Sequence, residues 1–225
     1  MSGLRAVVFD FDGIILESVD VKTRAFVALF ADWPQHADEI RRLHLDNAGM
    51  PRYEKFERIH RDILGLPLDE EESARLGREF GALIRAEMLS CDFVAGAPEL
   101  LERLAASYPL YVASATPEGE MREIVSERGL DRFFTEVYGS PASKAEILSR
   151  ILSENDLEPG EIVFVGDALS DYSAARKVGA AFVARVPPGG EIVFPDDGVS
   201  ATVPDLLELD RRWGELETSF AGWTR

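Results

Sequence analysis

The sequence predicts an α/β fold, in which a parallel sheet with helices on both faces carries a helical insert after its first strand. Three observations support this prediction. Short continuous apolar runs recur along the chain, helical patterns lie between most of them, and residues 18–90 show helical patterns alone. Continuous apolar runs are typical of strands buried on both faces, and strands that alternate with helices form parallel sheets.

The apolar runs predict six short strands, most of them ending directly before a polar residue or a glycine. The four most apolar runs cover 6–9, 110–113, 162–165 and 180–184, and two weaker ones cover 136–138 and 201–203.

Apolar residues at helical spacing predict helices between these strands, near 98–104, 116–125, 147–152 and 174–178. Thr116 and Pro117 have the pattern of a cap followed by a first-turn proline. The tail after Trp213 has no clear pattern, and we expect it to fray.

The insert contains three apolar stripes, over 26–33, 56–63 and 76–84. Asp69 is a candidate cap for the last of these helices, with the Glu72 side chain reaching back toward it. We therefore divide the chain into a core, formed by 1–16 and 91–225, and a helical cap, formed by 17–90.

Composition disfavours several classes of function. The formal net charge of −17 argues against a nucleic-acid-binding surface and against docking on anionic lipid. No apolar run approaches the ~18 residues that span a bilayer. The single cysteine, Cys91, allows no disulfide within the chain, and the first residues do not form a signal peptide, so we expect a cytoplasmic protein. The oligomeric state, monomer or homodimer, stays open.

The segment from Asp10 to Gly13 is the first candidate for chemistry. Asp10 and Asp12 are two residues apart, so an extended backbone points both carboxylates to the same side. They follow an apolar strand, and ligands of open α/β sheets bind beyond the carboxyl ends of the strands. Gly13 permits a sharp exit from the strand.

Other polar residues are predicted to gather at the same edge of the sheet. Ser114 and Asp167 follow later strands, Lys144 opens a helix, and Asp171 comes four residues after Asp167. This set suits phosphoryl transfer: a carboxylate can attack phosphorus and form an aspartyl phosphate. The Asp10 carboxylate and the phosphate are both anions and repel each other. Two positive charges would offset this repulsion: Mg²⁺, held by carboxylates such as Asp10 and Asp167, and the ammonium group of Lys144.

The remaining groups have complementary roles in this hypothesis. The Ser114 hydroxyl and nearby backbone N–H groups would hold phosphate oxygens at a helix N-terminus. Asp12 would act as general acid toward the leaving oxygen and later as base for water.

These motifs resemble those of the haloacid dehalogenase-like hydrolase superfamily, in its phosphatase branch and its phosphoglycolate-phosphatase-like group. The resemblance rests on VVFDFDGIILES at 7–18, YVASAT at 111–116, Lys144 within SPASKAEIL, and VGDALSDYSAA at 165–175. It implies a Rossmann-like core with a helical cap inserted after the first motif.

The resemblance also implies roles for single residues. Asp10 matches the nucleophile, and Asp12 matches the acid/base, whose backbone carbonyl also binds magnesium. Ser114 and Lys144 match the phosphate-binding hydroxyl and the motif lysine. Asp167 matches the metal-binding acid, and Asp171 matches the second acid, which helps to hold the metal or to orient the lysine. Ile14 departs from the threonine that many members have.

The insert carries a basic stripe formed by Arg52, Lys55, Arg58 and Arg61. This stripe is either a solvated helix face or a source of substrate contacts, in which Arg52 or Lys55 reaches the cleft and binds an anionic substrate. The three histidines, His36, His44 and His60, have no metal-site spacing and are expected to be surface or packing residues.

The sequence thus predicts a magnesium-dependent phosphatase acting on a small phosphorylated metabolite. A phosphomutase of the same family would return the phosphate to a second hydroxyl. A response-regulator-like module would keep a long-lived phosphoaspartate, and a non-catalytic relative would only bind a partner.

Overall fold

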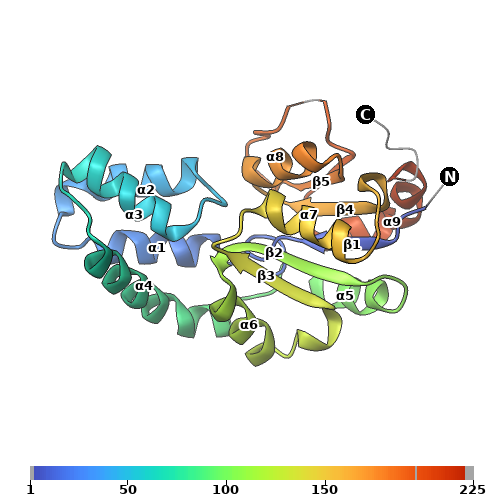
Figure 1. Ribbon diagram of the computed structural model, residues 1–225, viewed down its shortest axis with the longest axis horizontal. Helices are drawn as coiled ribbons and strands as arrows, with labels where there is room; N and C mark the ends of the chain where they lie inside the picture. The colour runs from blue at the N-terminus through green and yellow to red at the C-terminus, as the bar shows by residue number, and fades with distance from the viewer. Residues whose placement is uncertain (1–2, 196, 221–225) are drawn as a thin grey trace.

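The computed structural model describes residues 3–195 and 197–220. A six-stranded, all-parallel sheet lies at its centre, in the order β3-β2-β1-β4-β5-β6 (Figure 1). The predicted Rossmann-like α/β fold is therefore confirmed. The strands are β1 (Ala6–Phe9), β2 (Leu110–Pro117), β3 (Glu136–Ser140), β4 (Ile162–Gly166), β5 (Ala181–Arg185) and β6 (Ala201–Val203).

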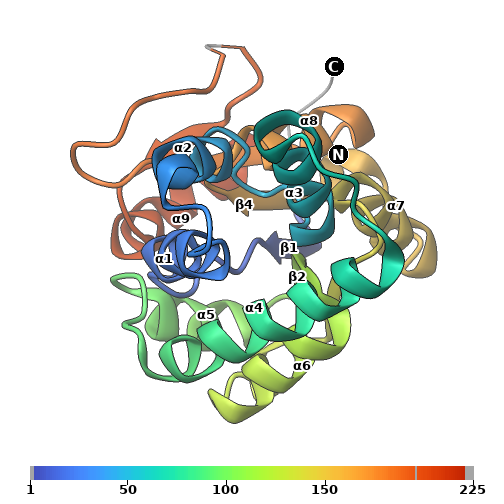
Figure 2. The same cartoon turned by 90° about the vertical axis from the view of Figure 1, so that its left-hand side faces the viewer.

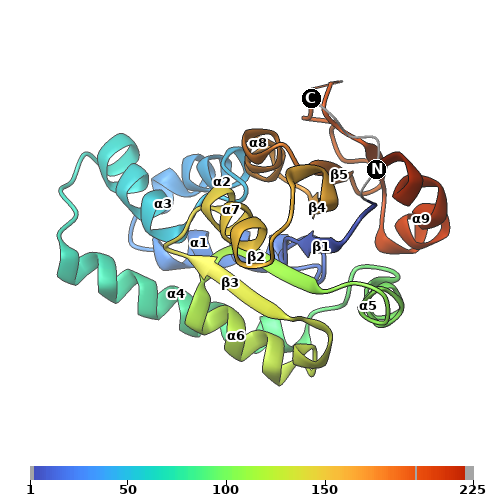
Figure 3. The same cartoon turned by 45° about the vertical axis from the view of Figure 1, so that its right-hand side comes forward.

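Successive residues of a strand point to opposite faces of the sheet, so both faces carry apolar side chains, and helices cover each of them. Val7 and Phe9 of β1 join one apolar core, whereas Ala6 and Val8 join the other. The first core is covered by α5 (Ala97–Ala105), α6 (Glu118–Glu127) and α9 (Leu206–Phe220). The second is covered by α7 (Lys144–Glu154) and α8 (Leu169–Val178), as Figure 3 shows.

Two predictions about element ends were wrong. Thr116 does not cap a helix, because β2 stays extended as far as Pro117, which pairs with Ser140 of β3, and α6 begins only at Glu118. The chain after Trp213 does not fray before Phe220. Trp213, Leu216 and Phe220 are buried along one face of α9, which gives this helix a packed anchor. Residues 221–225 lie outside the described residues.

The segment between β1 and α5, all of it described, contains helices and no strand. The helices are α1 (Val19–Leu29), η1 (Pro34–His36), α2 (Ala37–Asp46), α3 (Arg52–Arg58), the π-helix η2 (Ile59–Leu64) and α4 (Glu70–Ser90). They pack together to one side of the sheet, and Figure 2 looks onto them. We call them the cap; its division from the core at residues 17 and 90 stays a prediction.

Aromatic side chains hold the cap together. The Phe26 ring lies 4.5 Å from that of Phe80 and 5.8 Å from that of Phe56, measured between centroids, so one residue from each of α1, α3 and α4 meets the others. Asp69 caps α4 by accepting a hydrogen bond from the Glu72 backbone at 2.8 Å. The Glu72 side chain does not reach back as predicted, because it pairs with Arg75 instead.

None of the helices in the described part of the chain combines the length and the apolarity that crossing a membrane requires.

Candidate active site

The site lies at the carboxyl edge of the two central strands. Phe9 at the end of β1 pairs with Val165 of β4, and the Asp10 backbone N–H donates to the Val165 carbonyl at 2.9 Å. Asp10 and Asp167 therefore leave neighbouring strands side by side. Because the chain turns in opposite directions from β1 and β4, the strand order reverses here, which is where open α/β sheets bind ligands.

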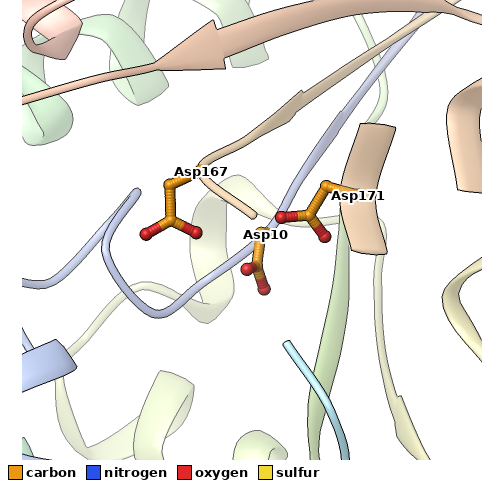
Figure 4. Close-up of side chains that lie close together, drawn as sticks. All are labelled: Asp10, Asp167 and Asp171. Atoms are coloured by element: carbon orange, nitrogen blue, oxygen red, sulfur yellow. The ribbon is translucent and has the colours of Figure 1, made fainter. Parts of the chain in front are cut away.

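Three carboxylates meet at this edge. Asp10, Asp167 and Asp171 each offer an oxygen within 4.8 Å of the others, and their side chains converge in Figure 4. Asp10 and Asp171 are buried. Both Asp171 oxygens already accept hydrogen bonds, one from the Lys144 ammonium and one from the Ala168 backbone at 3.0 Å. Both Asp10 oxygens are engaged as well, one by the backbone N–H of the next residue at 2.7 Å and one by Lys144 at 2.9 Å. Asp167 is therefore the acid of the three with the fewest partners among the described residues, and Asp171 fixes Lys144.

The cluster has an excess of negative charge. Burial, together with the charges of Asp171 and Asp12, raises the pKa of Asp10 to about 7, despite the opposing effect of Lys144. Burial and the Asp10 carboxylate also raise the pKa of Asp167 well above its ordinary value. A buried group of acids that resists ionisation fits a divalent cation, because the cation supplies the missing positive charge and carboxylate oxygens are its preferred ligands.

Lys144 supplies the positive charge that the chain itself provides. Its Nζ lies 2.9 Å from Asp10 Oδ2 and forms a second ion pair with Asp171. Burial alone would lower the pKa of Lys144, but the charges of Asp10 and Asp171 raise this pKa above its ordinary value. Lys144 is the first residue of α7, and a capping box between Ser143 and Glu146 fixes the start of that helix. The ammonium is thus held in one place and stays charged.

Asp12 faces the cap. It accepts hydrogen bonds from Ser18 Oγ at 2.7 Å and from Thr116 Oγ at 3.4 Å, and it forms an ion pair with Lys22 of α1. Lys22 also donates to the Thr116 hydroxyl at 2.8 Å. Burial alone would raise the pKa of Asp12, but the Lys22 ammonium holds this pKa below its ordinary value.

Sequence reasoning missed Lys22 and assigned Thr116 to a helix cap. Neither belongs to a local pattern that could have revealed its position. Thr116 approaches Asp12 because β2 stays extended beside β1. Lys22 does so from the first turn of α1, directly after Ser18, which also binds Asp12.

Ser114 is fully buried on β2, the strand next to β1. Its hydroxyl accepts a hydrogen bond from the Thr116 backbone at 3.1 Å. Ser114 lines a second pocket together with Lys144, and it is not among the residues that line the cavity described below. Its predicted contact with a phosphate oxygen therefore stays a prediction.

A tight loop after Asp12 is fixed by the last residue of β5, which lies two strands away from β1 in the sheet. Arg185, the last residue of β5, donates to the Gly13 carbonyl at 2.6 Å and forms an ion pair with Glu17. Gly13 has φ +73°, and a Cβ placed on it would lie 2.1 Å from Asp167 Oδ2. Glycine is therefore required here both for the backbone and for the position of Asp167.

Gly13→Ala is expected to remove most of the activity by displacing Asp167, and to cost about 1–2 kcal/mol from the left-handed backbone as well. Gly129→Ala is a matched control, since Gly129 has φ +67° and an added Cβ would meet no described atom within 4 Å. Thermal melting and phosphate release should show both variants destabilised, but only Gly13→Ala inactive. Equal activity of the two would contradict the requirement for close packing against Asp167.

A cavity of ≈ 70 Å³ separates the cap from this edge of the sheet. Its walls include Asp10, Asp12 and Lys144 from the core and Arg52 and Lys55 from α3. Both basic residues are buried, so the reading of the stripe as a solvated face is wrong for these two.

The two cap residues differ in their partners. Arg52 donates to Glu120 of α6 at 2.7 Å, and its guanidinium lies 4.7 Å from the centroid of the Phe80 ring. Lys55 Nζ lies 3.1 Å from His44 Nδ1 and donates to the His44 carbonyl at 3.3 Å. His44, expected only to pack, therefore also lines the cavity.

Fold and site together define an α/β enzyme with a carboxylate cluster at the sheet edge, covered by a helical cap. The chain belongs to the haloacid dehalogenase-like hydrolase family, whose model matches residues 7–185. The family assignment from the four motifs is thus confirmed, and the chain is a hydrolase of the phosphatase type.

Curated relatives and solved structures agree with this assignment. The chain is 27% identical to a 5'-nucleotidase of Pseudomonas aeruginosa, over 79% of this chain and 80% of the relative. It is 26% identical to a phosphoglycolate phosphatase of Synechococcus elongatus, over 80% and 83%. A predicted phosphatase from Clostridium acetobutylicum has the same fold, with a TM-score of 0.76 at 18% identity over 95% of this chain and all of the other.

Proposed function

We propose that the protein is a magnesium-dependent phosphatase, which hydrolyses a small phosphate monoester through an aspartyl phosphate on Asp10. The convergence of Asp10, Asp167 and Asp171 around Lys144 is the observation that carries this proposal. Asp10, Asp167 and the backbone carbonyl of Asp12 would hold Mg²⁺, with Asp171 as a further acid beside them. Bound Mg²⁺ would neutralise the charge that the phosphate brings to these acids.

In the first step, an Asp10 carboxylate oxygen attacks phosphorus. The bond from phosphorus to the ester oxygen breaks, and the departing oxygen takes a proton from Asp12. In the second step, Asp12 takes a proton from water as the water oxygen attacks the same phosphorus. The bond to Asp10 breaks, and inorganic phosphate leaves. Lys144 stays charged throughout, and Ser114 is proposed to hold a phosphate oxygen.

Lys22 affects the two steps in opposite directions, because its ammonium disfavours the protonated form of Asp12 that donates to the departing oxygen. Its ammonium favours the ionised form of Asp12, which is the form that accepts a proton from water. The Thr116 hydroxyl that bridges Lys22 and Asp12 keeps both groups at the cap side of the site. Arg52 and Lys55 are proposed to contact the substrate from the opposite wall.

The substrate is proposed to be a small phosphorylated metabolite in the cytoplasm. Cys91 is a free thiol in the structure, which is compatible with such a reducing compartment. A screen of phosphorylated metabolites and an aryl phosphate tests the proposal. Phosphate release should require Mg²⁺, should stop when EDTA is added, and should resume when excess Mg²⁺ is restored.

Hydrolysis that is unaffected by EDTA would contradict the metal requirement. Return of the phosphate to a second hydroxyl of a sugar phosphate would instead identify a mutase. A phosphoaspartate that persists without turnover would identify a signalling module.

A further inference from the structure

The carboxyl end of β5 carries a charged residue that the proposed reaction does not use. Asp10 follows β1 and Asp167 follows β4, and both have a part in that reaction. Arg185 is the last residue of β5, the strand beside β4. Its side chain is 6% exposed, so a guanidinium is buried at the same edge of the sheet as the carboxylates. Burying a charge is costly unless it is paired and hydrogen-bonded, so its contacts indicate what it does.

The Arg185 guanidinium joins three segments of the chain. Nη1 donates to the Gly13 carbonyl at 2.6 Å, and Nε donates to the Pro204 carbonyl at 3.1 Å. Nη1 and Nη2 also donate to the two oxygens of Glu17, at 3.1 and 2.6 Å. Glu17 is the one acid among the described residues that forms an ion pair with Arg185. The guanidinium therefore leaves Asp167 uncovered, although that acid follows the adjacent strand.

Asp167 depends on packing for its position. In the described part of the chain, no donor forms a hydrogen bond to its carboxylate, whereas Asp10 and Asp171 both accept hydrogen bonds. Gly13 lies directly against this carboxylate, because a Cβ on Gly13 would lie 2.1 Å from Asp167 Oδ2 and 3.0 Å from its Cγ. The place of Gly13 thus determines the space that the Asp167 carboxylate occupies.

Local hydrogen bonds shape the loop around Gly13, but they do not fix where it lies relative to β4. The Gly13 backbone N–H donates to the Leu16 carbonyl at 2.8 Å, and the Ile15 backbone N–H donates to the Phe11 carbonyl at 2.9 Å. These bonds begin and end within the loop. The bond from Arg185 to the Gly13 carbonyl instead joins the loop to β5, which pairs with β4.

We infer that Arg185 is a positioning residue for the cation site: it holds Gly13 against the Asp167 carboxylate and so fixes a ligand of the divalent cation. This inference rests on the proposed function, in which Asp167 helps to hold Mg²⁺. Groups that orient metal ligands without touching the metal typically change its affinity by about 10- to 100-fold when they are removed.

The direction of the effect distinguishes positioning from charge. Arg185→Met removes a positive charge near the cation site and leaves Glu17 without its ion-pair partner. By charge alone, both changes would tighten the binding of a cation. Positioning predicts the opposite result, a dissociation constant for Mg²⁺ that rises by about tenfold or more. Mg²⁺ alone is titrated into the protein while the melting temperature is followed, since the stabilisation depends on the Mg²⁺ concentration relative to this constant.

Turnover at different Mg²⁺ concentrations distinguishes positioning from a general structural role. At the Mg²⁺ concentration that half-saturates the parent protein, Arg185→Met should lose activity by about fivefold or more. In saturating Mg²⁺, its kcat should recover to within about threefold of the parent value. A merely structural role would lower kcat at every Mg²⁺ concentration and leave the dissociation constant unchanged, and that result would overturn the inference.

The conservative variant keeps the charge but not the geometry. The ammonium of Arg185→Lys lacks the planar fork that contacts Gly13 and Glu17 together, so its affinity for Mg²⁺ should lie between those of Arg185→Met and the parent. If Arg185→Met does not fold, Arg185→Lys provides the comparison with the parent.

Arg5→Met is the matched control. Arg5 also joins strands by a side chain, but at the amino edge of the sheet, where it donates to the Asp156 carbonyl at 3.1 Å and pairs with Glu161 at 3.3 Å. This variant should keep the parent affinity for Mg²⁺. An equal loss of affinity in Arg5→Met would show that any loosening of the sheet weakens the site, and would overturn the assignment to Arg185.

Failure of this inference can be told apart from failure of the proposed function. Parent-like or tighter Mg²⁺ binding by every folded Arg185 variant would overturn the inference. If the parent protein still releases phosphate only in Mg²⁺, the phosphatase function stands. Turnover by the parent protein without any divalent cation would overturn both.

Discussion

Asp10→Asn is expected to reduce phosphate release to the level of a protein-free control, a loss on the order of 10⁵-fold. An amide nitrogen or its neutral oxygen cannot replace the attacking carboxylate, and the change also removes one proposed ligand of the cation. The measurement is phosphate release in Mg²⁺ with an aryl phosphate and with the best metabolite found. Acid quenching during turnover, followed by mass spectrometry, should locate the phosphate on the peptide that contains Asp10 in the parent protein only.

Asp32→Asn serves as the matched control for this substitution. Asp32 is an exposed acid of the cap, so the variant loses the same charge far from the site. It should retain the parent activity. Activity of Asp10→Asn above a few per cent of the parent would show that another group attacks phosphorus, and the proposed reaction would have to be abandoned.

The same substitution should raise stability when no metal is present. The pKa of Asp10 is raised from 3.8 to about 7, so the folded protein binds this proton up to a higher pH than the unfolded chain does. Stability is therefore lost as pH rises between about 4 and 7, by at most about 4 kcal/mol. Asp10→Asn has no such proton to lose. In EDTA at pH 8 it should melt above the parent protein, and the difference should shrink toward pH 4.

The core could be predicted from sequence because its strands coincide with short apolar runs that are visible in the local sequence. Ala6–Phe9 is a continuous apolar run that ends at an acid, and it is buried throughout. Since carboxyl ends of parallel strands share one edge, the strand ends alone were enough to bring Asp10 and Asp167 together in the hypothesis.

The cap side of the site could not be predicted in this way. Lys22 and His44 lie on different helices, and only the packing of α1 and α2 against the rest of the cap brings both to the cavity wall. Helical periodicity shows which residues share a face of one helix, but it does not show which helix that face meets. For the same reason, the sequence could not separate the roles of Arg52 and Lys55. In the structure, Arg52 forms an ion pair with Glu120, whereas Lys55 contacts His44.

Lys144→Met is expected to destabilise the protein by about 3–5 kcal/mol at pH 8, because it leaves Asp10 and Asp171 buried without their counter-charge. Part of this loss should be recovered at pH 6, where the remaining acids can bind protons instead. Activity should fall by about 10²–10³-fold, since a fixed positive charge beside the phosphate is gone. Urea unfolding at the two pH values and phosphate release in saturating Mg²⁺ are the measurements.

Lys177→Met is the control, because it removes the exposed lysine of α8 and should change neither quantity. The double variant Asp10→Asn, Lys144→Met gives the sharper test. If the lysine acts by neutralising the acids, removing one acid should restore part of the stability that Lys144→Met loses, so the two effects will not add. Simple additivity, or full stability of Lys144→Met at pH 8, would mean that the ammonium does not hold this cluster together.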